Sequence, residues 1–67
     1  MNERKEIFTY CDRVLDGFGR EITRRYEADT IAVSEKKARA NLIYRFKREH
    51  GLAATAKITL PGKLQKL

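Results

Sequence analysis

The 67-residue chain has little of what usually stabilises a domain of its size. It contains one cysteine, Cys11, so no disulfide can form within the chain, and one histidine, His50. A structural zinc site takes four ligands, and these two residues cannot supply them. Chains this short bury only a small core. We therefore expect one domain over residues 1–67, without metal or other cofactor, that gains stability by forming a homodimer.

Long apolar runs are also missing. No uninterrupted apolar run exceeds three residues, whereas a membrane-spanning helix needs about 20. The first residues, MNERKEIF, lack the apolar segment of a signal peptide. We expect a cytoplasmic protein with no membrane partner.

The sequence contains no recognisable enzyme motif. Its four glycines are too scattered to form a phosphate-binding loop. Asp12 and Asp16 could form a carboxylate pair, but neighbouring arginines are better partners for them on a surface. A chain this short also leaves little room for a deep pocket. We expect a protein without catalytic residues or a small-molecule substrate.

Acidic residues are scarce in the second half of the chain. Residues 1–35 carry six Lys or Arg and eight Asp or Glu, whereas residues 36–67 carry nine Lys or Arg and one acid, Glu49. Such an asymmetry indicates a surface for an anionic partner, and nucleic acid is the first to consider.

Residues 3–16 have apolar residues at spacings of three and four, which is typical of one face of a helix. Asn2 can serve as its N-cap, and Gly17 can end it. In this helix the thiol of Cys11 is expected to be buried and inert. The residues that form the apolar stripe are Ile7, Cys11, Val14, Leu15 and Phe18.

Residues 20–33 alternate in the manner of a strand, but the parity of the apolar residues changes at Asp29-Thr30. Either one bent strand with a bulge or a short hairpin would explain the change. We favour the bent strand, because neither Gly nor Asn marks a two-residue turn. Arg24 is expected to pair with an acid of the first helix (Glu6, Asp12 or Asp16).

Residues 34–50 carry the clearest helix signals in the chain. Ser34 is a good N-cap, and His50-Gly51 provides a C-terminal stop. Between them, Ala38, Leu42 and Phe46 form an apolar stripe with a spacing of four.

Residues 54–60 alternate between apolar and polar residues and are expected to form a second strand. The predicted fold class is thus α+β, with the order helix–strand–helix–strand. A strand–helix–strand unit favours a crossover that places the two strands side by side and parallel. Two strands make a poor sheet, so pairing between copies could complete it.

The run YEADTIAVSEKKARANLIYRFKREHGL, followed by AKITLPGKL, resembles small proteins of bacteriophages and integrated mobile elements in Gram-positive bacteria. The resemblance covers about residues 22–64. It consists of a strand ending near Ser-Glu-x-x-Ala, a basic aromatic helix and a final strand. It implies a small α+β accessory protein and no catalytic residue.

The basic helix is the main candidate site. Its cations could contact phosphates of nucleic acid with little sequence specificity, while Tyr44 could stack on a base and Asn41 could bond a base edge. The residues expected to bind are Lys36, Lys37, Asn41, Tyr44, Arg45, Lys47 and Arg48. Two alternatives stay open: a solvated helix face, or a protein-interaction module that binds no nucleic acid and exposes apolar residues on its sheet or at Leu64 and Leu67.

Overall fold

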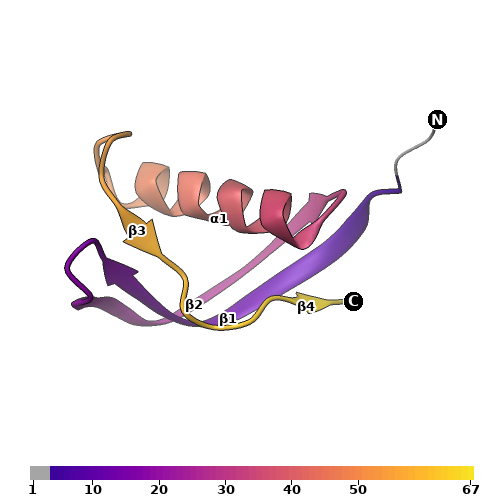
Figure 1. The fold of residues 1–67 in the computed structure, drawn as a ribbon, viewed down its shortest axis with the longest axis horizontal. Helices are drawn as coiled ribbons and strands as arrows, with labels where there is room; N and C mark the ends of the chain where they lie inside the picture. The colour runs from indigo at the N-terminus through magenta and orange to yellow at the C-terminus, as the bar shows by residue number, and fades with distance from the viewer. Residues whose placement is uncertain (1–3) are drawn as a thin grey trace.

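The computed structural model describes residues 4–67, which form a four-stranded antiparallel sheet with a helix packed on one face (Figure 1). The predicted α+β class is confirmed. The predicted N-cap Asn2 lies outside the described residues. Along the chain the elements are β1 (Glu6–Asp16), β2 (Glu21–Ala32), α1 (Glu35–Glu49), β3 (Ile58–Thr59) and β4 (Gln65–Lys66).

The prediction of a helix over residues 3–16 is wrong, because residues 6–16 form strand β1. Phe8, Tyr10 and Val14 project from one face of β1 and are buried, whereas Ile7 and Cys11 project from the other face and are exposed. The apolar residues of this segment fit both a helical and an alternating spacing. Aromatic and β-branched residues at its start favour the strand.

β1 and β2 form a hairpin whose turn is stabilised by one side chain. Asp16 Oδ1 accepts hydrogen bonds from the backbone N–H of Phe18 (2.8 Å) and of Arg20 (2.9 Å). The hydrogen bond from the Arg20 N–H is the main reason that the pKa of Asp16 lies below its ordinary value, and the bond from the Phe18 N–H lowers this pKa further. Gly19 adopts a φ of +80°, which a residue with a Cβ rarely adopts.

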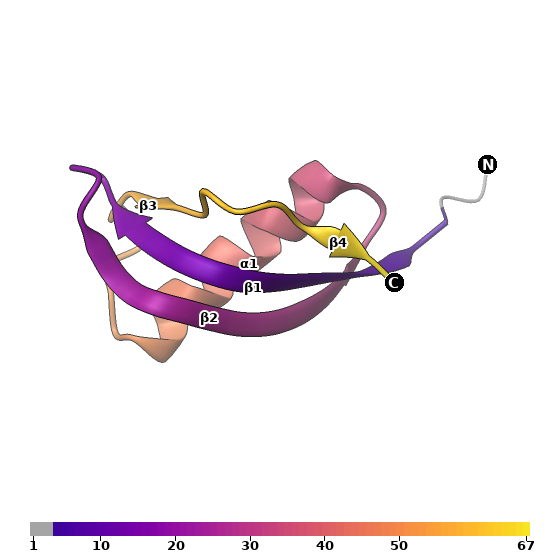
Figure 2. The same ribbon diagram turned by 90° about the horizontal axis from the view of Figure 1, so that it is seen from below.

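β2 is one continuous strand, as favoured over the hairpin. The predicted change of parity at Asp29-Thr30 is wrong, because Ala28 and Ala32 are both buried and Ile31 between them is exposed. The pairing with β1 instead shifts register twice between Asp12 and Leu15, nearer the turn. Bulges of this kind bend a strand, and both strands of the hairpin curve in Figure 2.

The predicted helix at residues 34–50 is confirmed. The Ser34 hydroxyl accepts a hydrogen bond from the Lys37 backbone N–H (3.2 Å), and the side chains that face the sheet are those of Ala38, Leu42 and Phe46. The Leu52 N–H bonds the Lys47 carbonyl (2.8 Å) past the end of α1, where Gly51 has a φ of +64°. A glycine in this conformation commonly ends a helix.

The predicted strand at residues 54–60 is largely wrong, since only residues 58–59 pair with a neighbour. As β3 they pair with Asp16 and Leu15 of β1, and farther along β1 the same edge pairs with β4. β2 and β3 run in the same direction, but β1 lies between them. The predicted neighbouring parallel strands are therefore absent from this antiparallel sheet.

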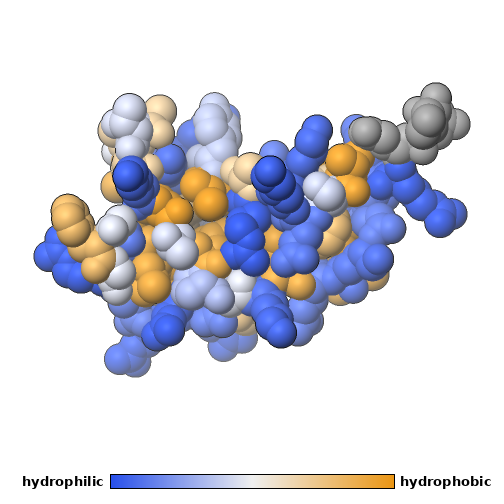
Figure 3. Space-filling view, viewed as in Figure 1, coloured by the Kyte–Doolittle hydropathy of each residue, from blue (hydrophilic) through white to orange (hydrophobic). Residues whose placement is uncertain are grey.

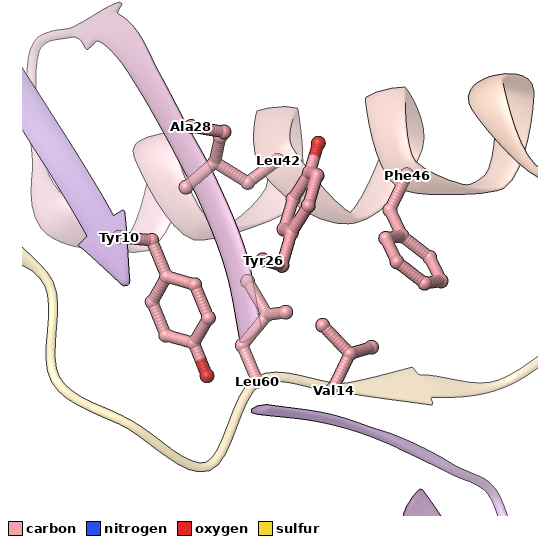
Figure 4. Packing of buried hydrophobic residues seen from close by; sticks show 7 residues of the cluster. All are labelled: Tyr10, Val14, Tyr26, Ala28, Leu42, Phe46 and Leu60. Atoms are coloured by element: carbon pink, nitrogen blue, oxygen red, sulfur yellow. The ribbon is translucent and has the colours of Figure 1, made fainter. Parts of the chain in front are cut away.

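The core lies between α1 and the sheet, and apolar residues gather in this layer in Figure 3. A smaller cluster near the start of α1 consists of Phe8, Ala32 and Ala38, and Leu64 packs against both clusters. The ring of Tyr26 meets that of Phe46 edge to face, with centroids 5.0 Å apart. The main cluster consists of Tyr10, Val14, Tyr26, Ala28, Leu42, Phe46 and Leu60 (Figure 4).

Tyr10 joins the hairpin to the C-terminal segment. Its buried hydroxyl donates a hydrogen bond to the Arg13 carbonyl (2.6 Å) and accepts one from the Gly62 N–H (3.1 Å). Gly62 passes so close to Asp12 that a Cβ on it would collide with that side chain. Burial is the main reason that the pKa of Tyr10 lies above its ordinary value.

Tyr10→Phe should lower the free energy of unfolding by about 1–3 kcal/mol at pH 7, because the Gly62 N–H loses its partner in a buried site. The raised pKa means that the phenol proton is bound more tightly in the folded state. The contribution of Tyr10 to the free energy of unfolding is fully present below about pH 10 and is lost as the pH rises through the folded-state pKa. Urea unfolding at pH 7 and 11 should therefore show that the difference in free energy of unfolding between wild type and variant is smaller at pH 11. A larger difference at pH 11 would contradict this role of Tyr10.

Cys11 should react with a thiol reagent in the native protein, because its side chain is exposed on the sheet face opposite α1. The original expectation of a buried thiol predicts protection until the chain unfolds. A colorimetric disulfide reagent should label one thiol per chain within minutes in the absence of denaturant. Labelling that required urea would argue against β1 as a strand in this register.

Candidate functional site

Of the seven residues predicted to bind nucleic acid, all but Arg45 lie on the outer half of α1. The buried stripe of Ala38, Leu42 and Phe46 faces the sheet, and at about 100° per residue the predicted residues fall on the two flanks of the helix. One flank faces the free edge of β2, and the other faces the C-terminal segment. Lys36 and Lys47 lie on the second flank; the first carries Lys37, Asn41, Tyr44, Arg45 and Arg48.

A groove of about 580 Å³ runs between the first flank of α1 and the edge of β2, and we refer to it as the edge groove. Four of the seven predicted residues line it. Thr30 and Glu49 also line it, although the sequence did not single them out, because only the packing of α1 on β2 brings them there. The complete lining is Thr30, Asn41, Tyr44, Arg45, Arg48 and Glu49.

Tyr44 and Arg48 form the solvent side of the edge groove. The Tyr44 ring is 64% exposed, and Arg48 is exposed one turn farther along the helix. Arg48 forms none of the ion pairs found within residues 4–67. Asn41 lies one turn before Tyr44, with its amide nitrogen 3.5 Å from the Thr30 hydroxyl. An exposed aromatic ring thus stands between an amide and a cation, both able to contact a ligand.

Arg45 is tied to the sheet, in contrast with Arg48. Its guanidinium donates a hydrogen bond to the Asp29 carbonyl (2.9 Å), and its Nε lies 3.8 Å from the Glu49 carboxylate. Glu49 also accepts a hydrogen bond from the Tyr26 hydroxyl (2.9 Å). Burial, followed by this bond to a carboxylate, raises the pKa of Tyr26. Arg45 therefore stabilises the packing of α1 on β2, and Glu49 offsets part of its charge.

Lys37 lies beyond the other end of the edge groove. It lines a second hollow of about 490 Å³ together with Lys5, and Asn41 lies between the two hollows. Lys5 precedes β1, so the predicted helix over residues 3–16 gave no reason to associate it with this site. No local pattern of the sequence links Lys5 with Lys37, because only the packing of α1 on the sheet brings the two to the same hollow.

Lys36 and Lys47 do not belong to the edge groove. Lys36 is exposed, whereas Lys47 is half-buried and donates a hydrogen bond from Nζ to the Ala54 carbonyl (3.0 Å). On the same flank Arg39 donates to the carbonyls of Leu60 and Gly62. Lys47 and Arg39 thus stabilise the C-terminal segment against α1, whereas Lys36 forms no such hydrogen bond with any of residues 4–67.

The basic residues of the strands are placed differently from what the sequence indicated. Arg24 was expected to pair with Glu6, Asp12 or Asp16, but Glu6 pairs with Lys66 (3.1 Å), Asp16 pairs with Arg20 (3.2 Å), and Arg24 forms none of the ion pairs found within residues 4–67. The predicted geometry is wrong because the first helix that would have carried these acids is a strand.

The sheet face opposite α1, which we call the open face, is not strongly basic. Arg25 lies there, 2.8 Å from the Glu27 carboxylate, and its Nε donates to Cys11 Sγ (3.2 Å). The contacts with Cys11, which contribute most, and with Glu27 raise the pKa of Arg25 above its ordinary value. Asp29 adds another negative charge to this face. On the outer half of α1, by contrast, Lys36, Lys37 and Arg48 are exposed and form none of the ion pairs found within residues 4–67.

Within residues 4–67, no three His, Cys, Asp or Glu side chains gather in a way that could hold a metal ion. At 15 residues, α1 lacks the length and apolar character that a bilayer-spanning helix needs. Neither finding points to a second site that would compete with the outer half of α1.

The candidate site is defined by the chain's own residues, in particular by the line of Lys37, Asn41, Tyr44 and Arg48 beside the edge groove. No relative supplies a function or a set of site residues that could be compared with this line. Searches with the chain found no match among protein-family models, curated proteins or solved structures.

Proposed function

We propose that the chain is a small non-enzymatic accessory protein that binds nucleic acid through the outer half of α1, mainly by phosphate contacts and with little sequence specificity. The observation that carries the proposal is the line of Lys37, Asn41, Tyr44 and Arg48. These side chains are exposed, and neither cation of the line forms an ion pair found within residues 4–67.

The dimensions of this line suit a nucleic-acid strand. Lys37 and Arg48 are 11 residues apart, which corresponds to about 16 Å along the helix axis. Over that distance one strand of B-form DNA presents about five phosphates. Lys36, exposed on the other flank, adds a third cation near the start of α1. Cations at both ends of the line can therefore contact phosphates of the same strand.

The residues between the cations suit contacts other than those with phosphate. The exposed ring of Tyr44 offers a stacking surface that accepts any base. Asn41 and Thr30 carry donors and acceptors for a base edge at the floor of the edge groove. Glu49 repels a phosphate that enters the groove deeply, so phosphates belong on the outer side of α1 and bases toward the groove.

The biological setting belongs to the same proposal. A cytoplasmic location agrees with the composition of the chain, and a role in a bacteriophage or mobile element rests on the sequence resemblance described above. Non-specific binding of nucleic acid is suited to an accessory protein, because it depends on charge and is indifferent to sequence.

A protein-interaction module is the second candidate function. A specific observation favours it: Ile7, Ile31 and Leu67 are large apolar residues exposed on the open face, at 44%, 60% and 76%. Leu64, the other leucine considered at the sequence level, packs against the core instead. Exposed apolar residues that lie together commonly mark a contact with another protein.

The double variant Lys37→Glu/Arg48→Glu should abolish binding of nucleic acid while leaving the fold intact, since both side chains are exposed. Fluorescence anisotropy with labelled duplex DNA, single-stranded DNA and RNA over about 50–300 mM salt measures the effect. Wild type should bind with a steep dependence on salt. For the single variants Lys37→Ala and Arg48→Ala, the slope of log affinity against log salt should become shallower by about one each.

Lys57→Glu/Lys63→Glu is the matched control, because it changes the net charge equally at two exposed lysines away from α1. This variant should retain most of the wild-type affinity. Equal losses in the two double variants would mean that net charge alone determines binding. No binding by wild type at 50 mM salt would refute the proposal and favour the interaction module.

A further inference from the structure

Three apolar side chains lie in a row across the open face, and we call them the apolar row: Ile31 on β2, Ile7 on β1 and Leu67 after β4. Ile7 and Ile31 are direct partners in the antiparallel pairing of β1 and β2. The Leu67 backbone N–H donates to the Ile7 carbonyl (2.9 Å), which continues the pairing of β4 with β1. Residues paired in this way project from the same face, so the three form one patch.

Two routes to a homodimer are open to a sheet of this kind: pairing at the free edge of β2, and packing of the open faces. Because the carbonyl of Ile7 points toward Leu67, the pair Ile7–Ile31 is of the non-hydrogen-bonded type. The polar backbone groups of Ile31 and Asp29 therefore point toward the free edge. A second copy of β2 would have to pair with these groups.

The free edge is already partly occupied. Arg45 of α1 reaches over it and bonds the Asp29 carbonyl, which is one way in which proteins protect an edge strand from pairing. Pairing of two β2 edges would also bring two α1 helices together at their basic flanks. Lys37 and Arg48 of each copy would then face like charges. The structure thus disfavours the β2 edge. β3 and β4 at the other edge comprise only two residues each, which leaves the open face.

We propose that two copies of this chain pack against each other through their open faces, with the apolar row at the centre and the two α1 helices on the outside. A dimer of this type has a twofold axis in the plane of contact. With the axis along the row, each residue of the row meets its own copy. Asp29, two residues from Ile31, then comes beside Lys5 of the second copy, which lies two residues from Ile7 in the opposite direction.

The charges beside the row agree with this arrangement, and the position of the row limits the area of contact. Arg25 is neutralised within its own chain by Glu27, which leaves the opposite charges of Asp29 and Lys5 next to the row. Ile7 is the second residue of β1 and Ile31 the second-last residue of β2, so the row crosses one end of the sheet. Two copies related by an axis along the row therefore overlap only around this end, and each buries less than the roughly 800 Å² of a standard interface. The dimer should accordingly be weak and form in the micromolar to millimolar range.

Sedimentation equilibrium over about 10 µM to 1 mM protein tests the proposal, a range chosen to bracket the expected affinity. Wild type should associate to a dimer, and Ile7→Glu and Leu67→Glu should each shift the dissociation constant upward by at least tenfold. Ile7 is on the central strand, so this variant affects a contact of the open face and leaves the β2 edge unchanged. Phe18→Glu is the matched control, because Phe18 is 85% exposed at the hairpin turn, away from the row, and it should associate like wild type.

A charge exchange tests the predicted contact between Asp29 and Lys5. Asp29→Lys and Lys5→Asp should each weaken the dimer, and the double variant should associate more strongly than either single variant. Circular dichroism establishes that each variant is folded. A wild-type chain that stays monomeric at 1 mM would overturn the proposal. So would Ile7→Glu and Leu67→Glu variants that are folded and associate as wild type does.

Discussion

The rest of the structure depends on the contacts that the Tyr10 hydroxyl makes with Arg13 and Gly62. The hydroxyl accepts a hydrogen bond from the Gly62 N–H and donates one to the Arg13 carbonyl of its own strand. The C-terminal segment is thereby attached to the middle of β1. From the other layer, Arg39 of α1 bonds the carbonyls of Leu60 and Gly62. The hairpin, the helix and the C-terminal segment therefore meet at Gly62. Because β3 and β4 each comprise two residues, strand pairing alone would hold this segment weakly.

This two-layer arrangement gives the molecule two chemically different surfaces. On the helix side, Lys36, Lys37 and Arg48 are exposed, and Tyr44 stands among them. On the sheet side, charges of both signs lie around an apolar row. α1 covers one face of the sheet and leaves the other bare, so a ligand on the helix side and a protein on the sheet side would not compete. The two proposals made above are thus compatible in one molecule.

Predictions from the sequence are accurate where they depend on interactions between neighbouring residues and fail where they depend on contacts between distant ones. The bounds of α1 are set by local signals: the Ser34 cap, the spacing of four in the buried stripe, and Gly51 after its end. The prediction for β1 was wrong because its apolar residues fit both the helical and the alternating spacing. The strand is selected by pairing with distant residues, up to residue 32 in β2 and between 58 and 66 in β3 and β4. The line on α1 could be predicted because it needs only helical geometry. Thr30, Lys5 and the structural use of Lys47 depend on which elements pack together, and no local pattern records that.

The central position of β1 has a consequence for folding during synthesis. One edge of β1 pairs with β2, which follows it after a short turn, whereas its other edge pairs with residues 58–66. The hairpin and α1 can form as soon as they leave the ribosome, but the second edge of β1 stays open until residue 66 has emerged. Until then the nascent chain presents an unpaired strand edge. A chaperone that binds extended apolar segments would find its target in β1.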